Sequence, residues 1–110
     1  MTAAQILPGT LELLILRAVS LGSLHGYGVL RRIEQLSSGA LLIEEGALYP
    51  ALWRLERQKL VKAEWGVSDN NRKAKFYELT KAGTRQIARE RENWQNSVAL
   101  MARFLEPAQE

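Results

Sequence analysis

A proline-free stretch of 25 residues, 81–105, most limits what this chain can fold into. Thr80 is a good helix N-cap residue at its start, and Pro107 follows its end, so the stretch predicts one continuous helix. Such a helix is about 37 Å long. A small domain within a chain of 110 residues does not cover that length. We therefore expect part of this helix to extend beyond its own domain.

Apolar residues recur along this stretch with the period of a seam between two helices. The seam consists of Ile87, Arg91, Trp94, Val98, Met101 and Leu105. These positions alternate in steps of four and three residues, which gives an a/d seam of about three heptads with Arg91 as its charged member. Because one chain offers no second helix for such a seam, the sequence predicts a homodimer.

The segment from Thr10 to Leu21 is also helical in length and is apolar on more than one face. A helix that is apolar most of the way round has to be enclosed by other elements. We therefore expect Leu11 and Ile15 to join the seam, with the first and last helices of two subunits packed together.

The positive charge of the chain is concentrated in one segment. The sequence carries 15 Lys and Arg against 12 Asp and Glu, a net charge of +3. Residues 57–75 alone carry six basic and two acidic side chains, whereas residues 1–56 sum to −1 and residues 76–110 balance. This concentration indicates an anion-binding surface, with a solvated positive loop as the alternative.

The order of the predicted elements points to one fold. The patterns predict helices at Thr10–Leu21, Tyr27–Ser37 and Ala47–Lys59, a stub of strand at 41–43, and hairpin strands at Leu60–Trp65 and Lys75–Leu79. This is the plan of a winged helix-turn-helix, in which the third helix lies in a major groove and the hairpin forms a wing. The predicted class is mainly α (α+β), with the winged domain at residues 1–79 and a dimerisation helix at 80–110.

Composition excludes several kinds of chemistry. The chain has no cysteine and one histidine, His25. These counts exclude a disulfide framework, a thiolate nucleophile and a multi-His metal centre, so we expect no metal, no cofactor and no enzyme. The carboxylate pair Glu44-Glu45 is better explained by a favourable interaction with a helix N-terminus. No apolar run approaches ~20 residues, and the N-terminus lacks the charge of a signal peptide. We expect a cytoplasmic protein with no membrane partner.

Three motifs lie along the chain in a specific order. They are LHGYG at residues 24–28, EGALYPALWRLE at 45–56 and YELTKAG at 77–83. Together they resemble the PadR family of bacterial transcriptional regulators, from about Gly9 to the C-terminus. The chain departs from the family pattern at Gln58-Lys59-Leu60, where a glycine commonly precedes the leucine, and at Gly28 in the second helix. The resemblance implies a dimeric DNA-binding repressor whose C-terminal helix dimerises and often helps to form an effector pocket.

The candidate DNA-binding residues come from the second helix, the third helix and the wing. They are Tyr27, Ala47, Tyr49, Arg54, Asn70, Asn71, Arg72, Lys73 and Lys75. The wing residues would contact the backbone or the minor groove and add affinity more than sequence choice. Tyr27 lies beside Gly26, where backbone donors could hold a phosphate, although it could equally be a core aromatic.

The third-helix candidates each have a second interpretation. Tyr49 points off the apolar stripe and either reaches DNA or packs against the second helix. Arg54 either contacts DNA or pairs with Glu56 or Glu45. Ala47 and Ala51 share an outward side and would allow close approach to a groove, or they simply favour helix.

Trp94 also has two interpretations. In a dimer its twin faces it across the seam, and two indoles around a gap would form a slot for a small planar aromatic effector. Alternatively, both indoles fill the interface core. The function predicted is a homodimeric repressor that binds an inverted-repeat operator in double-stranded promoter DNA, with release by such an effector left open. The alternative is a winged-helix module for protein–protein contact with an acidic partner, without sequence-specific DNA binding.

Overall fold

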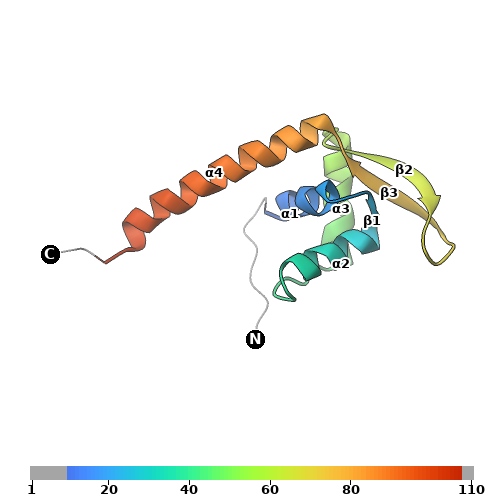
Figure 1. Ribbon diagram of the computed structural model, residues 1–110, viewed down its shortest axis with the longest axis horizontal. Coiled ribbons are helices and arrows are strands. Elements are labelled where there is room, and N and C mark those ends of the chain that lie inside the picture. The colour runs from blue at the N-terminus through green and yellow to red at the C-terminus, as the bar shows by residue number, and fades with distance from the viewer. Residues whose placement is uncertain (1–9, 108–110) are drawn as a thin grey trace.

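The computed structural model describes residues 10–107, so the outermost residues of the predicted domains, 1–9 and 108–110, lie outside it. Its elements follow the chain in the order α1 (Thr10–Ser20), β1 (Leu24–His25), α2 (Gly26–Leu36), α3 (Glu45–Arg57), β2 (Val61–Val67), β3 (Lys73–Leu79) and α4 (Lys81–Leu105). The antiparallel sheet has the strand order β1-β3-β2. Figure 1 shows α1, α2 and α3 gathered at one end of α4, with the β2–β3 hairpin projecting as a wing. The predicted winged helix-turn-helix with a long C-terminal helix is confirmed.

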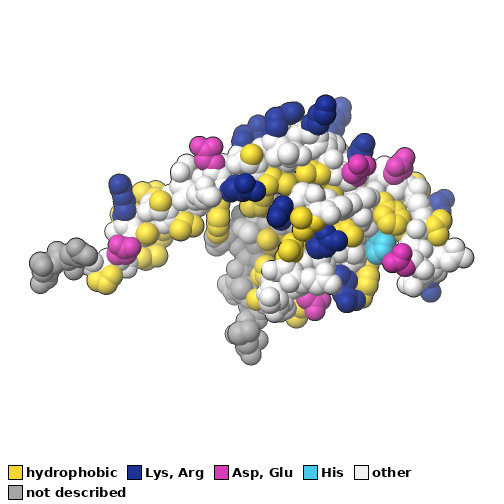
Figure 2. All heavy atoms as spheres, in the orientation of Figure 1, with side chains coloured by type: hydrophobic (Ala, Val, Ile, Leu, Met, Phe, Trp, Pro, Cys, Tyr) yellow, Lys and Arg dark blue, Asp and Glu magenta, His cyan; other side chains and the backbone are white. Residues whose placement is uncertain are grey.

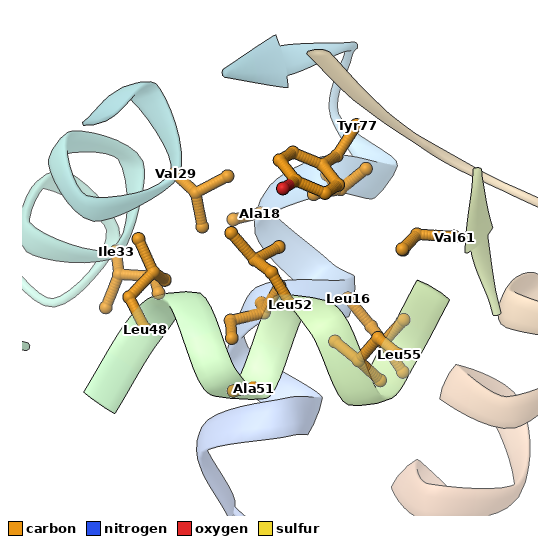
Figure 3. Close-up of a cluster of buried hydrophobic side chains, with 12 residues drawn as sticks. Leu16, Ala18, Val29, Ile33, Leu48, Ala51, Leu52, Leu55, Val61 and Tyr77 are labelled. Carbon is orange, nitrogen blue, oxygen red and sulfur yellow. The ribbon is translucent and has the colours of Figure 1, made fainter. Parts of the chain in front are cut away.

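The core lies between α3 and the elements that surround it. Leu48, Leu52 and Leu55 recur on one face of α3 and are fully enclosed. In Figure 3 they point toward side chains of α1 and α2 and toward Tyr77 of β3. This apolar face fixes the rotation of α3 about its axis, and therefore decides which of its residues remain outside.

The prediction of a stub strand at residues 41–43 is wrong. Those residues form no strand, and the third strand of the sheet is β1, which pairs through Leu24 with Tyr77 and through His25 with Phe76. Leu41 and Ile43 instead pack half-buried against the core. Their apolar side chains serve these core contacts. Their backbone forms no strand hydrogen bonds with the sheet.

The prediction that Ile15 belongs to a seam between subunits is also wrong. Ile15 has no exposed surface, because α2, α3, α4 and β3 of the same chain surround α1. Leu11 is half-buried against the same core. The apolar faces of α1 are therefore satisfied largely within one chain, and α1 alone gives no reason to expect a dimer.

Most of α4 extends away from the rest of the molecule. The radius of gyration is 16.2 Å, whereas a compact chain of this length is expected near about 13 Å. Ile87 packs against the core, but every residue from Arg91 to Met101 is exposed. Figure 2 shows hydrophobic side chains gathered along this extended part of the helix, beside charged and polar ones.

The start of α4 is fixed to the domain by its cap. Thr80 accepts a hydrogen bond from the Gly83 N–H at 3.0 Å, and its hydroxyl lies 2.8 Å from the Lys59 carbonyl and 3.0 Å from that of Leu60. Gly83 is buried against the same turn. A Cβ added there would lie 2.2 Å from the Leu60 carbonyl oxygen. The absence of a side chain at Gly83 is therefore what allows α4 to approach the domain.

Gly83→Ala is expected to destabilise the protein by about 2 kcal/mol, because the backbone carbonyl it meets cannot move aside freely. Helix propensity alone predicts the opposite sign, with a gain of about 1 kcal/mol. Urea unfolding at one fixed protein concentration measures the difference. Gly46→Ala in α3 is the matched control, since a Cβ there meets nothing within 4 Å. A Gly83→Ala variant as stable as the unaltered protein would contradict this account of the junction.

Candidate nucleic-acid interface

A groove of about 710 Å³ runs between the start of α2, Tyr49 of α3 and the inner face of the wing. Among its lining residues are Tyr27, Arg31, Tyr49, Trp65, Asn70, Arg72, Lys73 and Lys75. Five of the nine predicted DNA-binding residues lie in the wing, and of these Asn71 alone is absent from the lining. The structure therefore brings the wing candidates together with Tyr27 and Tyr49 around one groove.

The inner face of the wing combines aromatic and basic side chains. In the β2–β3 register, Trp65 lies opposite Lys75 and Val67 opposite Lys73, so these four residues share one face of the hairpin. The Lys73 ammonium lies 5.2 Å from the centre of the Trp65 ring, which is a cation–π distance. The ammonium is thereby held on the groove side of the wing.

The tip of the wing is exposed and tightly turned. Asn70, Asn71 and Arg72 are all exposed, and Asn71 adopts a left-handed backbone with φ 59°. Asparagine tolerates that conformation better than most residues. The return strand was predicted to begin at Lys75, whereas β3 begins at Lys73.

Lys75 is partly neutralised within the chain. Its ammonium lies 3.0 Å from a carboxylate oxygen of Glu56 on α3, and that hydrogen bond raises the pKa of Lys75. The contact ties the wing to α3. Lys75 therefore offers less free charge to an anion than Arg72 and Lys73, for which the structure gives no ion pair with a described residue.

Arg54 is held away from the groove. Its guanidinium donates two hydrogen bonds to one oxygen of Glu12 on α1, at 2.6 and 3.2 Å. The predicted pairing with Glu56 or Glu45 is wrong, because Glu12 lies 42 residues earlier in the sequence and only the fold brings it near. The pair joins α3 to α1.

Tyr49 packs against α2 and still faces the groove. Its ring lies over Gly26 so closely that a Cβ on Gly26 would be 2.6 Å from a ring carbon. The side chain remains 47% exposed. Ala47 is exposed as predicted, but Ala51 is fully buried in the core and the prediction that it faces outward is wrong.

The start of α2 is capped by His25. Its Nδ1 atom accepts a hydrogen bond from the Gly28 N–H at 3.0 Å, and its ring meets Phe76 edge to face at 5.4 Å. This cap already occupies one of the donors that the sequence left free for a phosphate. Tyr27 is exposed, and the Arg31 guanidinium lies 5.9 Å from its ring centre and donates to its hydroxyl at 3.4 Å.

Tyr77 closes the inner end of the groove. Burial raises the pKa of its phenol, and the neighbouring Lys75 ammonium opposes this with a smaller effect. The neutral phenol is therefore the form that the folded protein favours.

Tyr77→Phe is expected to reduce the loss of stability at alkaline pH. Because the pKa of the phenol is higher in the folded protein than in the unfolded chain, its contribution is complete below about pH 10 and is lost as the pH rises through the folded pKa. Phenylalanine does not ionise. The free energy of unfolding should therefore fall less for the variant between about pH 9 and about pH 11, as measured by urea titration. Equal declines would show that ionisation of Tyr77 is not linked to folding.

Two exposed tryptophans, Trp53 and Trp65, are absent from the residues that the sequence assigned to DNA. Trp53 comes directly after the buried Leu52 on α3, just as Tyr49 comes directly after the buried Leu48. This position next to the apolar stripe could have identified Trp53 as an outward-facing residue. Trp65 alternates with Ala63 on β2 and lies on the inner face beyond the end of the core. Both are more than half exposed.

The extended part of α4 carries the remaining seam residues. Trp94, Val98, Met101 and Leu105 are between 49% and 74% exposed, and they lie on one side of α4 over about three helix turns. They line a shallow apolar groove along the helix. Ile87 lies closer to the domain, where it packs partly against its own core.

Within residues 10–107, no group of three or more His, Cys, Asp or Glu side chains is placed to hold a metal ion. None of the described helices is long and apolar enough to cross a membrane.

The fold and the basic groove together define a winged helix-turn-helix protein of the kind found among transcriptional regulators. The model of the transcriptional regulator PadR-like family matches residues 15–89. The chain belongs to this family.

Three similar proteins illustrate the match. A PadR-like transcriptional regulator from Bacillus cereus is 26% identical with a TM-score of 0.78, and the match covers 96% of this chain and all of that one. A transcriptional regulator from Clostridium thermocellum shares the fold at 23% identity, with a TM-score of 0.80 over 89% of this chain and 92% of that one. An uncharacterised protein from Lysinibacillus sphaericus is 26% identical over 106 residues, covering 96% of this chain and 97% of that protein.

Proposed function

We propose that this protein is a homodimeric transcriptional repressor that binds an inverted repeat in promoter DNA. The observation that carries the proposal is the groove between α2, α3 and the wing. Its wing side presents Arg72 and Lys73 without ion pairs to described residues, while its α2 side presents Arg31. A row of cations beside an exposed helix suits a duplex, because the cations neutralise phosphates while the helix lies in the major groove.

The exposed stripe on α4 supports the dimeric part of the proposal. Trp94, Val98, Met101 and Leu105 form an apolar strip that the described part of the chain leaves uncovered. Large uncovered apolar strips mark interaction sites. A second α4 with the same heptad spacing is the partner that matches it in length and period. The predicted seam then consists of the α4 residues, with Leu11 at its margin and Ile15 excluded.

Dimerisation would place two α3 helices on one face of the DNA. In such an arrangement the half-sites lie about one helical turn apart and form an inverted repeat. Occupying a promoter would block transcription. This function places the protein in the cytoplasm. A small planar aromatic effector held between the two Trp94 side chains would release DNA if it favoured a different spacing of the winged domains.

Selection from a random double-stranded DNA library tests the proposal. The full protein is expected to enrich duplexes with two inverted half-sites, about 10 base pairs between centres. Enrichment of an unpaired half-site would contradict the dimeric part. Failure to enrich any sequence would favour the alternative of a winged-helix module for protein contact.

A further inference from the structure

The outermost face of α3 is opposite its buried stripe. Because the helix turns once per 3.6 residues, the residues farthest from the core are Gly46, Pro50, Trp53 and Arg57, and all four are exposed. Gly46 has no side chain and Pro50 is compact. The first large side chain on this face is therefore Trp53. None of the residues that sequence reasoning assigned to DNA lies on this line.

Trp53 and Arg57 form a stacked pair on that face. The Arg57 guanidinium lies 4.8 Å from the centre of the Trp53 ring, one helical turn apart. The stack restrains both side chains, so less conformational entropy is lost when either makes a contact. Trp53 remains 57% exposed. An aromatic side chain this open leaves apolar surface in contact with water, which costs free energy.

We propose that Trp53 is a specificity-determining residue that contacts the 5-methyl group of a thymine in the major groove, with Arg57 bound to an adjacent phosphate. This inference rests on the proposed function. In the major groove the thymine methyl is the one apolar group that a base pair presents, and apolar side chains recognise it by contact. A phosphate is the matching ligand for a guanidinium held beside it.

The test replaces thymine by deoxyuridine, which removes only the methyl group. The duplex enriched by the unaltered protein is changed one position at a time, in both half-sites. Losing one buried methyl should weaken binding about fourfold in each half-site, or about fifteenfold in the whole duplex. We expect one thymine position to show this loss with the unaltered protein and no loss there with Trp53→Ala.

Two controls separate base contact from structure. Trp65→Ala removes the exposed tryptophan of the wing, which lines the groove beside Lys73. It should weaken binding to all duplexes alike and leave the ratio of the thymine to the deoxyuridine affinity at that position unchanged. Trp53→Gln replaces the ring by a helix-compatible polar side chain and should behave as Trp53→Ala does. Thermal unfolding confirms that each variant is folded. Arg57→Gln should keep the thymine preference and lower the salt slope by about 2 per dimer, one phosphate contact in each half-site.

The outcomes distinguish the two levels of the argument. If the unaltered protein enriches a motif but Trp53→Ala and Trp53→Gln retain the same thymine preference, Trp53 does not read the methyl group and the inference is overturned. Indifference to every thymine methyl in the motif overturns it equally. If the unaltered protein enriches no motif, the proposed function fails and the inference fails with it.

Discussion

The Trp94→Arg variant is expected to sediment as a monomer at concentrations where the unaltered protein is a dimer. Trp94 is the first residue of the exposed apolar strip on α4, and a second helix packed along that strip would cover its exposed side. Arginine there would bury a charge opposite its own copy across the symmetry axis. An unpaired buried charge costs about 3 kcal/mol or more, so the dissociation constant should rise at least about 100-fold.

Asn96→Arg is the matched control for this prediction. Asn96 lies on the opposite side of α4 from Trp94, is exposed, and receives the same added charge. Sedimentation equilibrium should find this variant dimeric. A dimeric Trp94→Arg variant would remove the stripe from the interface, and a monomeric Asn96→Arg variant would show that added charge anywhere on α4 is sufficient.

Replacing Arg72 and Lys73 together by alanine is expected to make DNA binding less dependent on salt. The slope of log K against log salt concentration should fall in magnitude by up to about 4. Each phosphate contact contributes about 0.9 to the slope of log K against log salt concentration, and a dimer would lose four contacts. The wing holds both cations on or beside the groove, with Lys73 over the Trp65 ring. Affinity at low salt should fall by about two orders of magnitude, whereas sequence preference should change little.

A variant with Lys62 and Lys81 replaced by alanine provides the comparison. It loses the same formal charge, but neither residue lines the groove, and Lys62 is already 3.7 Å from Glu78. Its salt slope should stay close to that of the unaltered protein. Equal falls for the two double variants would mean that net charge, and not the wing, governs binding.

Local patterns were sufficient to predict most of the elements. The α3 stripe of Leu48, Leu52 and Leu55, the alternation along β2 and the N-cap at Thr80 each rest on neighbouring residues, and the structure confirms them. Patterns of this kind also predicted that α4 extends beyond its own domain. The element order then led to the winged helix-turn-helix.

Long-range contacts were beyond the same reasoning. The pairing of β1 with β3, the ion pair of Arg54 with Glu12 and the enclosure of Ile15 all join residues far apart in the sequence. Apolar periodicity shows that a face is buried but does not show which element buries it. For that reason α1 was assigned to a second chain when its own chain covers it.

Fluorescence anisotropy of the full protein on a labelled duplex tests the central claim most directly. The selected duplex and a scrambled duplex of equal length are titrated across a salt series. We expect preferential binding to the selected duplex, saturation at two chains per duplex, and a steep fall in affinity as salt rises. Equal and weak binding to both duplexes would contradict sequence-specific DNA recognition by this protein.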